Sequence, residues 1–194
     1  MKHIAQSAAA AAVALFVCAA FAADPEAGKA KAQVCAACHG PEGNSQNPAV
    51  PTIAGQPAQM IATQLYQFRE GNRKDAQMSP IAANLSNGEM NDLAAYFAGI
   101  NAAPPKHHSS AENAQRGPEL AKKFNCTQCH GPSLRGQQHI PRLAGQQPDY
   151  LRAQLKGFKA STRADMDGNM TSAAQALSDK DIEVLVDYLA GLGG

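Results

Sequence analysis

Two cysteines and a histidine recur at the same spacing in two places: Cys35-Ala-Ala-Cys38-His39 and Cys126-Thr-Gln-Cys129-His130. On a helical turn, two thiols three residues apart can form thioethers with the two vinyl groups of one porphyrin, and the next residue then points its imidazole at the iron. A C-x-x-C pair alone would also suit a redox dithiol or half of a zinc site, but neither uses the appended histidine. The spacing therefore predicts two covalently bound haem c groups.

Each haem iron would take the motif histidine as one axial ligand and needs a second. Beyond residue 22, the candidates for this second ligand are Met60, Met78, Met90, Met166, Met170, His107, His108 and His139. Met60 and Met90 fall on the apolar faces of expected helices, so we expect them in the core. The three histidines lie in a polar linker or a loop, where we expect them to be solvated. Three methionines remain: Met78, Met166 and Met170.

The spacing within the two copies selects among these methionines. Met78 precedes Ser86, an expected helix cap, by eight residues, and Met170 precedes the matching Ser178 by eight. Met166 lies twelve residues before that serine. We therefore predict Met78 as the second ligand of the first haem iron and Met170 as that of the second.

Ligation by histidine and methionine favours electron transfer over catalysis. A soft, neutral thioether sulfur stabilises ferrous iron, which gives such haems higher reduction potentials than haems with two histidines. With both axial positions filled, the iron has no open position for a substrate and changes charge without changing ligands. The sequence thus predicts an electron carrier and not an enzyme.

The chain is a tandem duplication, because the same landmarks return after 90 to 92 residues. The matches follow one order: Pro51-Thr-Ile-Ala-Gly55-Gln56 with Pro141-Arg-Leu-Ala-Gly145-Gln146, then Phe68 with Phe158, Arg73 with Arg163, Met78 with Met170 and Tyr96 with Tyr188. Between the copies, residues 101–112 include a proline pair and show no apolar periodicity, which is typical of a linker. We therefore expect domains at residues 23–100 and 113–194.

Each copy is predicted to be all-α with long loops. The first helix should run into the haem cysteines, roughly from Ala27 and from Gly117. The second should start at a proline and cover about 57–70 and 148–160. The last should begin at the capping boxes Ser86-x-x-Glu89 and Ser178-x-x-Asp181, continue with apolar residues at i, i+3, i+4 and i+7, and end at Gly99 and Gly191. No strand-like alternation of useful length is present.

Residues 1–22 have the pattern of a secretory signal peptide. A basic start precedes an apolar run over residues 8–21, which ends in small residues suited to cleavage near Ala22 or Ala23. The run is short for a membrane span, and no second apolar run follows. Cleavage would also remove Cys18, so every cysteine of the mature chain would lie in a haem motif. We expect a periplasmic protein whose mature chain has no transmembrane segment and is free to associate peripherally with a membrane.

Composition narrows the choice of partners. The formal net charge is +1, and neither copy carries the basic excess that a nucleic-acid-binding domain would need. Domains of about 80 residues have thin cores, and a buried macrocycle held by thioethers would stabilise them where disulfides are absent. The absence of tryptophan fits a core whose large flat element is the porphyrin.

The assembled pattern resembles class I cytochromes c, and its duplicated form resembles the di-haem cytochrome c4 family over the whole mature chain. The resemblance rests on both C-x-x-C-H sites, the two P-x-[IL]-A-G-Q loops, the methionine-to-serine spacing and the paired C-terminal helices. It implies two class I domains related by a pseudo-twofold axis, with the haems facing each other near the domain boundary.

The same resemblance implies several residue roles. The Pro51 carbonyl would accept a hydrogen bond from His39, and the Pro141 carbonyl one from His130, which would orient each ring. The first and last helices of each domain would cross closely, which would explain glycines opposite tyrosines: Gly28 with Tyr96 and Gly117 with Tyr188. Two arginines would either contact haem propionates or serve as exposed charges: Arg73 and Arg163.

The function implied is a periplasmic carrier that passes electrons from a quinol-oxidising membrane complex to a terminal oxidase or reductase. The alternative is the di-haem cytochrome subunit of a flavocytochrome c sulfide dehydrogenase, which would stay bound to a flavoprotein. A di-haem peroxidase would need one haem with a removable sixth ligand, and the matched methionines Met78 and Met170 argue against it.

Overall fold

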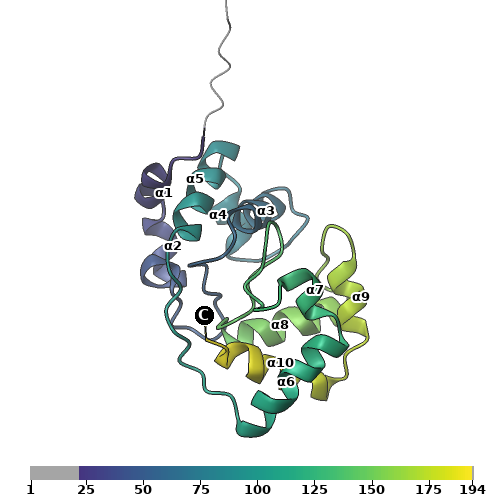
Figure 1. The fold of residues 1–194 in the computed structure, drawn as a ribbon. Helices are drawn as coiled ribbons and strands as arrows, with labels where there is room; N and C mark the ends of the chain where they lie inside the picture. Colours follow the sequence, from purple (N-terminus) through teal and green to yellow (C-terminus); the bar gives the residue numbers. More distant parts are fainter. Residues whose placement is uncertain (1–21, 194) are drawn as a thin grey trace, which may run out of the picture.

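The computed structural model describes residues 22–193, which fold into helices joined by loops (Figure 1). The first half contains α1 Pro25–Lys31, α2 Gln33–His39, the 3-10 helix η1 Pro41–Gly43, α3 Ala58–Arg69, α4 Met78–Ala82 and α5 Asn87–Ala98. The second contains α6 Ala111–Lys123, α7 Cys126–His130, α8 Pro148–Lys159, α9 Asn169–Gln175 and α10 Asp179–Gly191. One isolated bridge, Gln137 to Ile140, is the β pairing found among these residues. The all-α prediction is confirmed.

The strongest helix-start signals of the sequence act as predicted. Ser86 and Ser178 each accept a hydrogen bond from the backbone of the third helical residue, whose carboxylate in turn bonds the serine N–H. Pro57 caps α3 and Pro148 is the first residue of α8, where a missing N–H costs nothing.

Other boundaries differ from the prediction. The helix before the first haem motif breaks at Ala32 into α1 and α2, and α6 starts at Ala111, inside the segment assigned to the linker. Ser110 explains the earlier start, since its hydroxyl accepts from Asn113 N–H. Asn125 then adopts a left-handed conformation (φ 58°) and separates α6 from α7.

Each half places its first helix across its last. A Cβ added to Gly28 would lie 2.1 Å from the Asp92 carbonyl oxygen, and one added to Gly117 would lie 2.1 Å from Cγ of Tyr188. Only glycine allows so close an approach, so the predicted crossing of first and last helices is confirmed in both halves.

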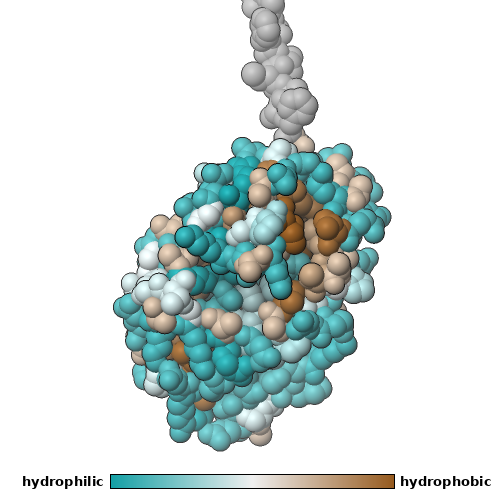
Figure 2. Space-filling view, turned by 180° about the vertical axis from the view of Figure 1, so that it is seen from behind, coloured by the Kyte–Doolittle hydropathy of each residue, from teal (hydrophilic) through white to brown (hydrophobic). Residues whose placement is uncertain are grey.

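Each half also has its own apolar core. In the first, Ile61 of α3 packs with Leu93 and Phe97 of α5, and in the second, Leu151 of α8 packs with Leu185 of α10. The linker runs down one side of the two lobes in Figure 1. The space-filling view in Figure 2 shows a largely hydrophilic surface with apolar patches, and the large apolar side chains most exposed are Val34, Tyr66, Ile81 and Met166.

No helix within residues 22–193 has the length and apolar character needed to cross a membrane. The predicted signal peptide, apart from Ala22, lies outside the described residues.

Candidate haem sites and the interface between the domains

The two motif histidines occupy equivalent environments. His39 ends α2 and is 7% exposed, and His130 ends α7 and is 3% exposed. Nδ1 of His39 lies 2.8 Å from the Pro51 carbonyl oxygen, and Nδ1 of His130 lies 2.7 Å from that of Pro141. Because a carbonyl only accepts, Nδ1 carries the proton, and Nε2 keeps the lone pair that binds a metal.

Burial also keeps these imidazoles neutral. It lowers the pKa of His39 and of His130 below the ordinary value, against the smaller opposing effect of the carbonyl hydrogen bond. A neutral ring is the form that coordinates iron, so these side chains are ready to act as ligands at neutral pH.

The four motif cysteines lie on the same short helices as the histidines, and none of them is in a disulfide. Cys35 and Cys126 are half-buried, and burial raises the pKa of each thiol, whereas Cys38 and Cys129 are exposed. In the part of the chain that the structure describes, no three His, Cys, Asp or Glu side chains form a metal-binding group. The two C-x-x-C pairs therefore do not join into one four-thiol zinc site.

The methionines separate into different environments. Met60 and Met90 are buried in the first-domain core, where the sequence predicts them. Met78 and Met170 are half-buried at the starts of α4 and α9. Met166 is 74% exposed.

The backbone of each half-buried methionine makes the same kind of hydrogen bond, to the carboxylate of a nearby aspartate. Met78 N–H donates to the Asp75 carboxylate (2.9 Å), and Met170 N–H donates to the Asp165 carboxylate (2.7 Å). The sequence predicts loops here, but each methionine lies at the start of a short helix that is too brief to show an apolar period, and the aspartate accepts from an N–H of its first turn.

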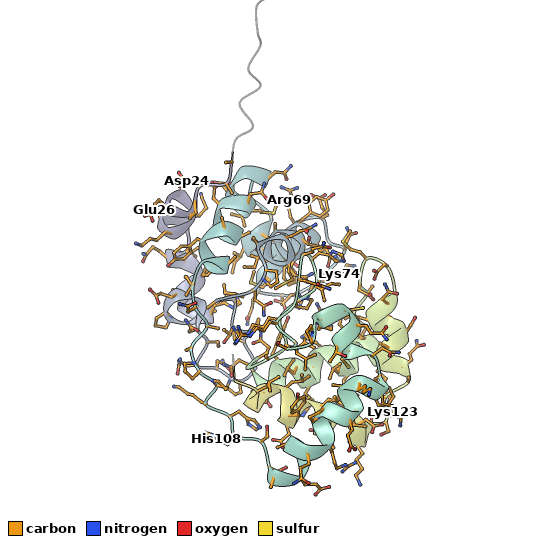
Figure 3. All side chains as sticks on the ribbon, viewed as in Figure 1. Asp24, Glu26, Arg69, Lys74, His108 and Lys123 are labelled. Atoms are coloured by element: carbon orange, nitrogen blue, oxygen red, sulfur yellow. The ribbon has the colours of Figure 1, made fainter. Side chains whose placement is uncertain are left out.

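The histidines outside the motifs do not approach either core. His108 lies on the linker, where its exposed side chain is labelled in Figure 3. His139 is exposed, and Nε2 of His107 lies 2.6 Å from the Asp187 carboxylate on α10.

Arg73 and Arg163 face each other across the boundary between the domains. Arg73 donates to Gln64 of its own domain (2.6 Å) and to Tyr150 (3.2 Å) and Gln154 (3.1 Å) of the other. Arg163 donates to Gln154 and, across the boundary, to Gln64 (3.4 Å). Both arginines are half-buried, so of the two alternatives for them, freely exposed charges do not fit the structure.

This boundary is strongly electropositive. Burial, with the nearby charge of Arg73, lowers the pKa of Arg163 to about 10. Burial alone would raise the pKa of the Tyr150 phenol, but the guanidiniums of Arg73 and Arg163 outweigh it and lower that pKa. Among the described residues, Nε of Arg163 is the one buried side-chain nitrogen or oxygen without a hydrogen-bond partner. A buried guanidinium N–H without a partner fits a carboxylate, such as the propionate of a haem.

Four further residues bond across the boundary and were not predicted from the sequence: Gln56, Gln146, Gln147 and Tyr150. In the sequence, Gln56 and Gln146 are matched positions at the ends of the two P-x-[IL]-A-G-Q loops. A repeat does not show, however, which domain a side chain contacts.

This chain is similar to known cytochromes c over both of its halves. The cytochrome c family model matches residues 25–100 and again residues 114–193. Cytochrome c4 of Thiocapsa roseopersicina is 42% identical over 180 residues, which cover 87% of this chain and 93% of the relative. The chain belongs to the cytochrome c4 family.

A solved structure and a further sequence relative agree with this membership. Reduced recombinant cytochrome c4 from Pseudomonas stutzeri superposes with a TM-score of 0.82 at 34% identity, over 88% of this chain and all of that one. A thiosulfate dehydrogenase electron acceptor of Stutzerimonas stutzeri is 36% identical, over 84% of this chain and 80% of the relative. As a cytochrome c4, the chain is a di-haem electron carrier and not an enzyme, and its cofactors are two covalently bound haem c groups.

Proposed function

We propose that this cytochrome c4 is a periplasmic carrier, which takes electrons from a quinol-oxidising membrane complex and delivers them to a terminal oxidase or reductase. The observation that supports the proposal most is the twofold occurrence of one buried, neutral, carbonyl-bonded histidine beside a C-x-x-C pair. Bound haem supplies the one-electron chemistry. The chain fixes the ligands, limits the access of water and sets the surrounding charge.

In this proposal, Cys35 and Cys38 would bind the first haem covalently, and His39 and Met78 would ligate its iron. Cys126, Cys129, His130 and Met170 would do the same for the second. The burial of Met170 and the exposure of Met166 support the choice between them. Pro51 and Pro141 orient the histidine rings.

Two arginines, Arg73 and Arg163, bind propionates in this proposal, one for each haem. Their positive charge disfavours ferric iron and so helps to keep both potentials high. The domains in this proposal are 23–100 and 113–194, as expected from the sequence, with α6 extending the second back to Ala111. Residues 1–22 direct export and are removed.

A second candidate donor is a dehydrogenase of sulfur compounds. The similarity to a protein described as a thiosulfate dehydrogenase electron acceptor favours this candidate. A permanent flavoprotein partner, as in flavocytochrome c sulfide dehydrogenase, is the remaining alternative. The purified form separates them, because a carrier is isolated without a flavin subunit.

A potentiometric titration of the purified protein, followed by absorption, tests the proposal. We expect two haems, both with the charge-transfer absorption that methionine gives to ferric haem, and both high in potential. Stopped-flow mixing should then show reduction by a quinol-oxidising complex and oxidation by a terminal oxidase at rates that fall with ionic strength. A high-spin or bis-histidine ferric centre would refute the proposal. So would a failure to react with either one of the two partners.

A further inference from the structure

Two buried glutamines connect the domains in a reciprocal way. The side-chain amide of Gln146 accepts a hydrogen bond from Thr52 N–H (2.8 Å) and donates one to the Thr52 carbonyl (2.9 Å). The amide of Gln56, in the other domain, accepts from Arg142 N–H (2.9 Å) and donates to the Arg142 carbonyl (3.0 Å). The glutamines are only 6% and 3% exposed, so water does not compete for these bonds.

The residues that these amides bind are next to the prolines that hold the motif histidines. Thr52 N–H and the Pro51 carbonyl belong to one peptide unit, and that carbonyl accepts the bond from His39. The amide oxygen of Gln146 and the ring of His39 therefore bond opposite ends of the same peptide, although they lie in different domains.

The second domain repeats this arrangement. Arg142 N–H and the Pro141 carbonyl form one peptide unit, which lies between Gln56 and His130. The Gln146 oxygen also accepts from Gln147 N–H (2.9 Å), which fixes its orientation.

Hydrogen bonds at the two ends of one peptide unit strengthen each other. An acceptor on the N–H increases the negative charge on the carbonyl oxygen. A stronger carbonyl acceptor draws more on the Nδ1 proton and makes the imidazole a better donor to iron. A better donor stabilises ferric iron, which lowers the reduction potential.

We propose that each glutamine tunes the haem of the opposite domain, so that Gln146 lowers the potential of the first haem and Gln56 that of the second. The glutamines are positioning residues, since they act through the peptide units of the two loops. This inference rests on the histidine ligation of the proposed function.

The alternative is that the glutamines only dock the domains. Gln147 provides the matched control, because it crosses the same boundary without touching either peptide unit. Its amide donates to the Ser45 carbonyl (2.9 Å) and to the Thr52 hydroxyl (3.4 Å). Gln147→Leu therefore weakens the docking but leaves Thr52 N–H bonded.

The test is a potentiometric titration of the holoprotein in four variants: Gln146→Leu, Gln56→Leu, Gln147→Leu and Gln146→Glu. A companion Met78→His protein, in which only the first haem should lose the methionine absorption, assigns each potential to its domain. We expect Gln146→Leu to raise the potential of the first haem alone and Gln56→Leu that of the second alone. Gln147→Leu should leave both unchanged.

Gln146→Glu keeps an oxygen acceptor for Thr52 N–H, so the reduction potential of the first haem should stay at or below its wild-type value. This variant keeps the inference testable even if Gln146→Leu folds poorly. The inference would be overturned if the reduction potential shifted for the haem of the mutated domain, shifted equally for both haems, or did not shift. A matching shift of potential in Gln147→Leu would also overturn it. A wild-type protein without methionine absorption would instead count against the proposed ligation, which keeps the two failures distinct.

Discussion

Two neighbouring methionines of the second domain have opposite environments. Met170 is half-buried and anchored through its N–H to Asp165, whereas Met166 is 74% exposed. Met170→Ala should therefore remove the methionine charge-transfer absorption from one haem of the two and lower its potential, because the thioether that stabilises ferrous iron is lost. Absorption spectra of the ferric protein, combined with potentiometry, measure both effects.

Met166→Ala is the matched control and should leave both the absorption and the potentials unchanged. If Met166→Ala removed the absorption and Met170→Ala did not, the alignment of the two copies would be in error by four residues.

The sequence predicts individual residues well where their chemistry depends on spacing along one helix or loop. The C-x-x-C-H motifs and the core positions of Met60 and Met90 are of this kind. The partners of Arg73 and Gln146 are not, because they depend on how two folded domains dock, and local sequence carries no information on that docking.

The crossing of α6 over α10 depends on one glycine. A Cβ at Gly117 would lie 2.1 Å from Cγ and 2.3 Å from Cβ of Tyr188, so Gly117→Ala must push the helices apart. We expect the free energy of unfolding to fall by about 1–3 kcal/mol, as for other overpacked sites. Denaturant titration of the holoprotein, followed by far-ultraviolet circular dichroism, gives the value.

Gly88→Ala in α5 is the control for this substitution. The nearest atom to its added Cβ is Ser86 Oγ at 3.9 Å, and alanine favours the helix, so stability should be unchanged or slightly higher. Equal losses in both variants would show that the crossing is not the cause.

Helices with strong local signals were predictable, and short ones were not. The capping boxes at Ser86 and Ser178 specify the starts of α5 and α10. The five-residue α4 and seven-residue α9 are too short for periodicity, and they depend on an aspartate carboxylate that accepts from a first-turn N–H and on the packing of the rest of the domain around them.

The carboxylate of Asp187 fastens the linker and α6 to α10. Burial alone would raise the pKa of this carboxyl, but hydrogen bonds from Asn113, His107 and Ser110 outweigh it and hold the pKa below its ordinary value. A carboxyl with a lowered pKa contributes stability above its unfolded pKa, which is lost as the pH falls through the folded one.

Asp187→Asn should therefore lower the free energy of unfolding by about 2 kcal/mol at neutral pH. The difference from wild type should begin to shrink below about pH 4, the ordinary pKa of an aspartate, and should vanish as the pH falls through the lower pKa of the folded carboxyl. Unfolding curves at several pH values measure this. Asp179→Asn, whose exposed carboxylate pairs with Lys159, should cost much less, and a difference for Asp187→Asn that persisted in acid would contradict the account.

At the scale of the whole molecule, the two halves share a plan but differ in the core that the side chains provide. In the second half, Ile182, Leu185 and Val186 of α10 are at most 1% exposed and pack with Leu134. The matching cluster of the first half has fewer buried residues among those described, and it includes the flexible Met60. The folded structure of the first half should therefore depend more on its haem for stability than that of the second half.

Replacing both cysteines of one motif by alanine tests this difference. The pair Cys35→Ala and Cys38→Ala should leave the first half largely without stable helix, because a thin core cannot offset the chain entropy of folding once the macrocycle is lost. The pair Cys126→Ala and Cys129→Ala should preserve more of the second half. Circular dichroism gives the helix lost in each protein, and limited proteolysis identifies the half that opens. Native-like helicity in a half without haem would show that side chains alone suffice, and a greater loss in the second half would reverse the ranking of the two cores.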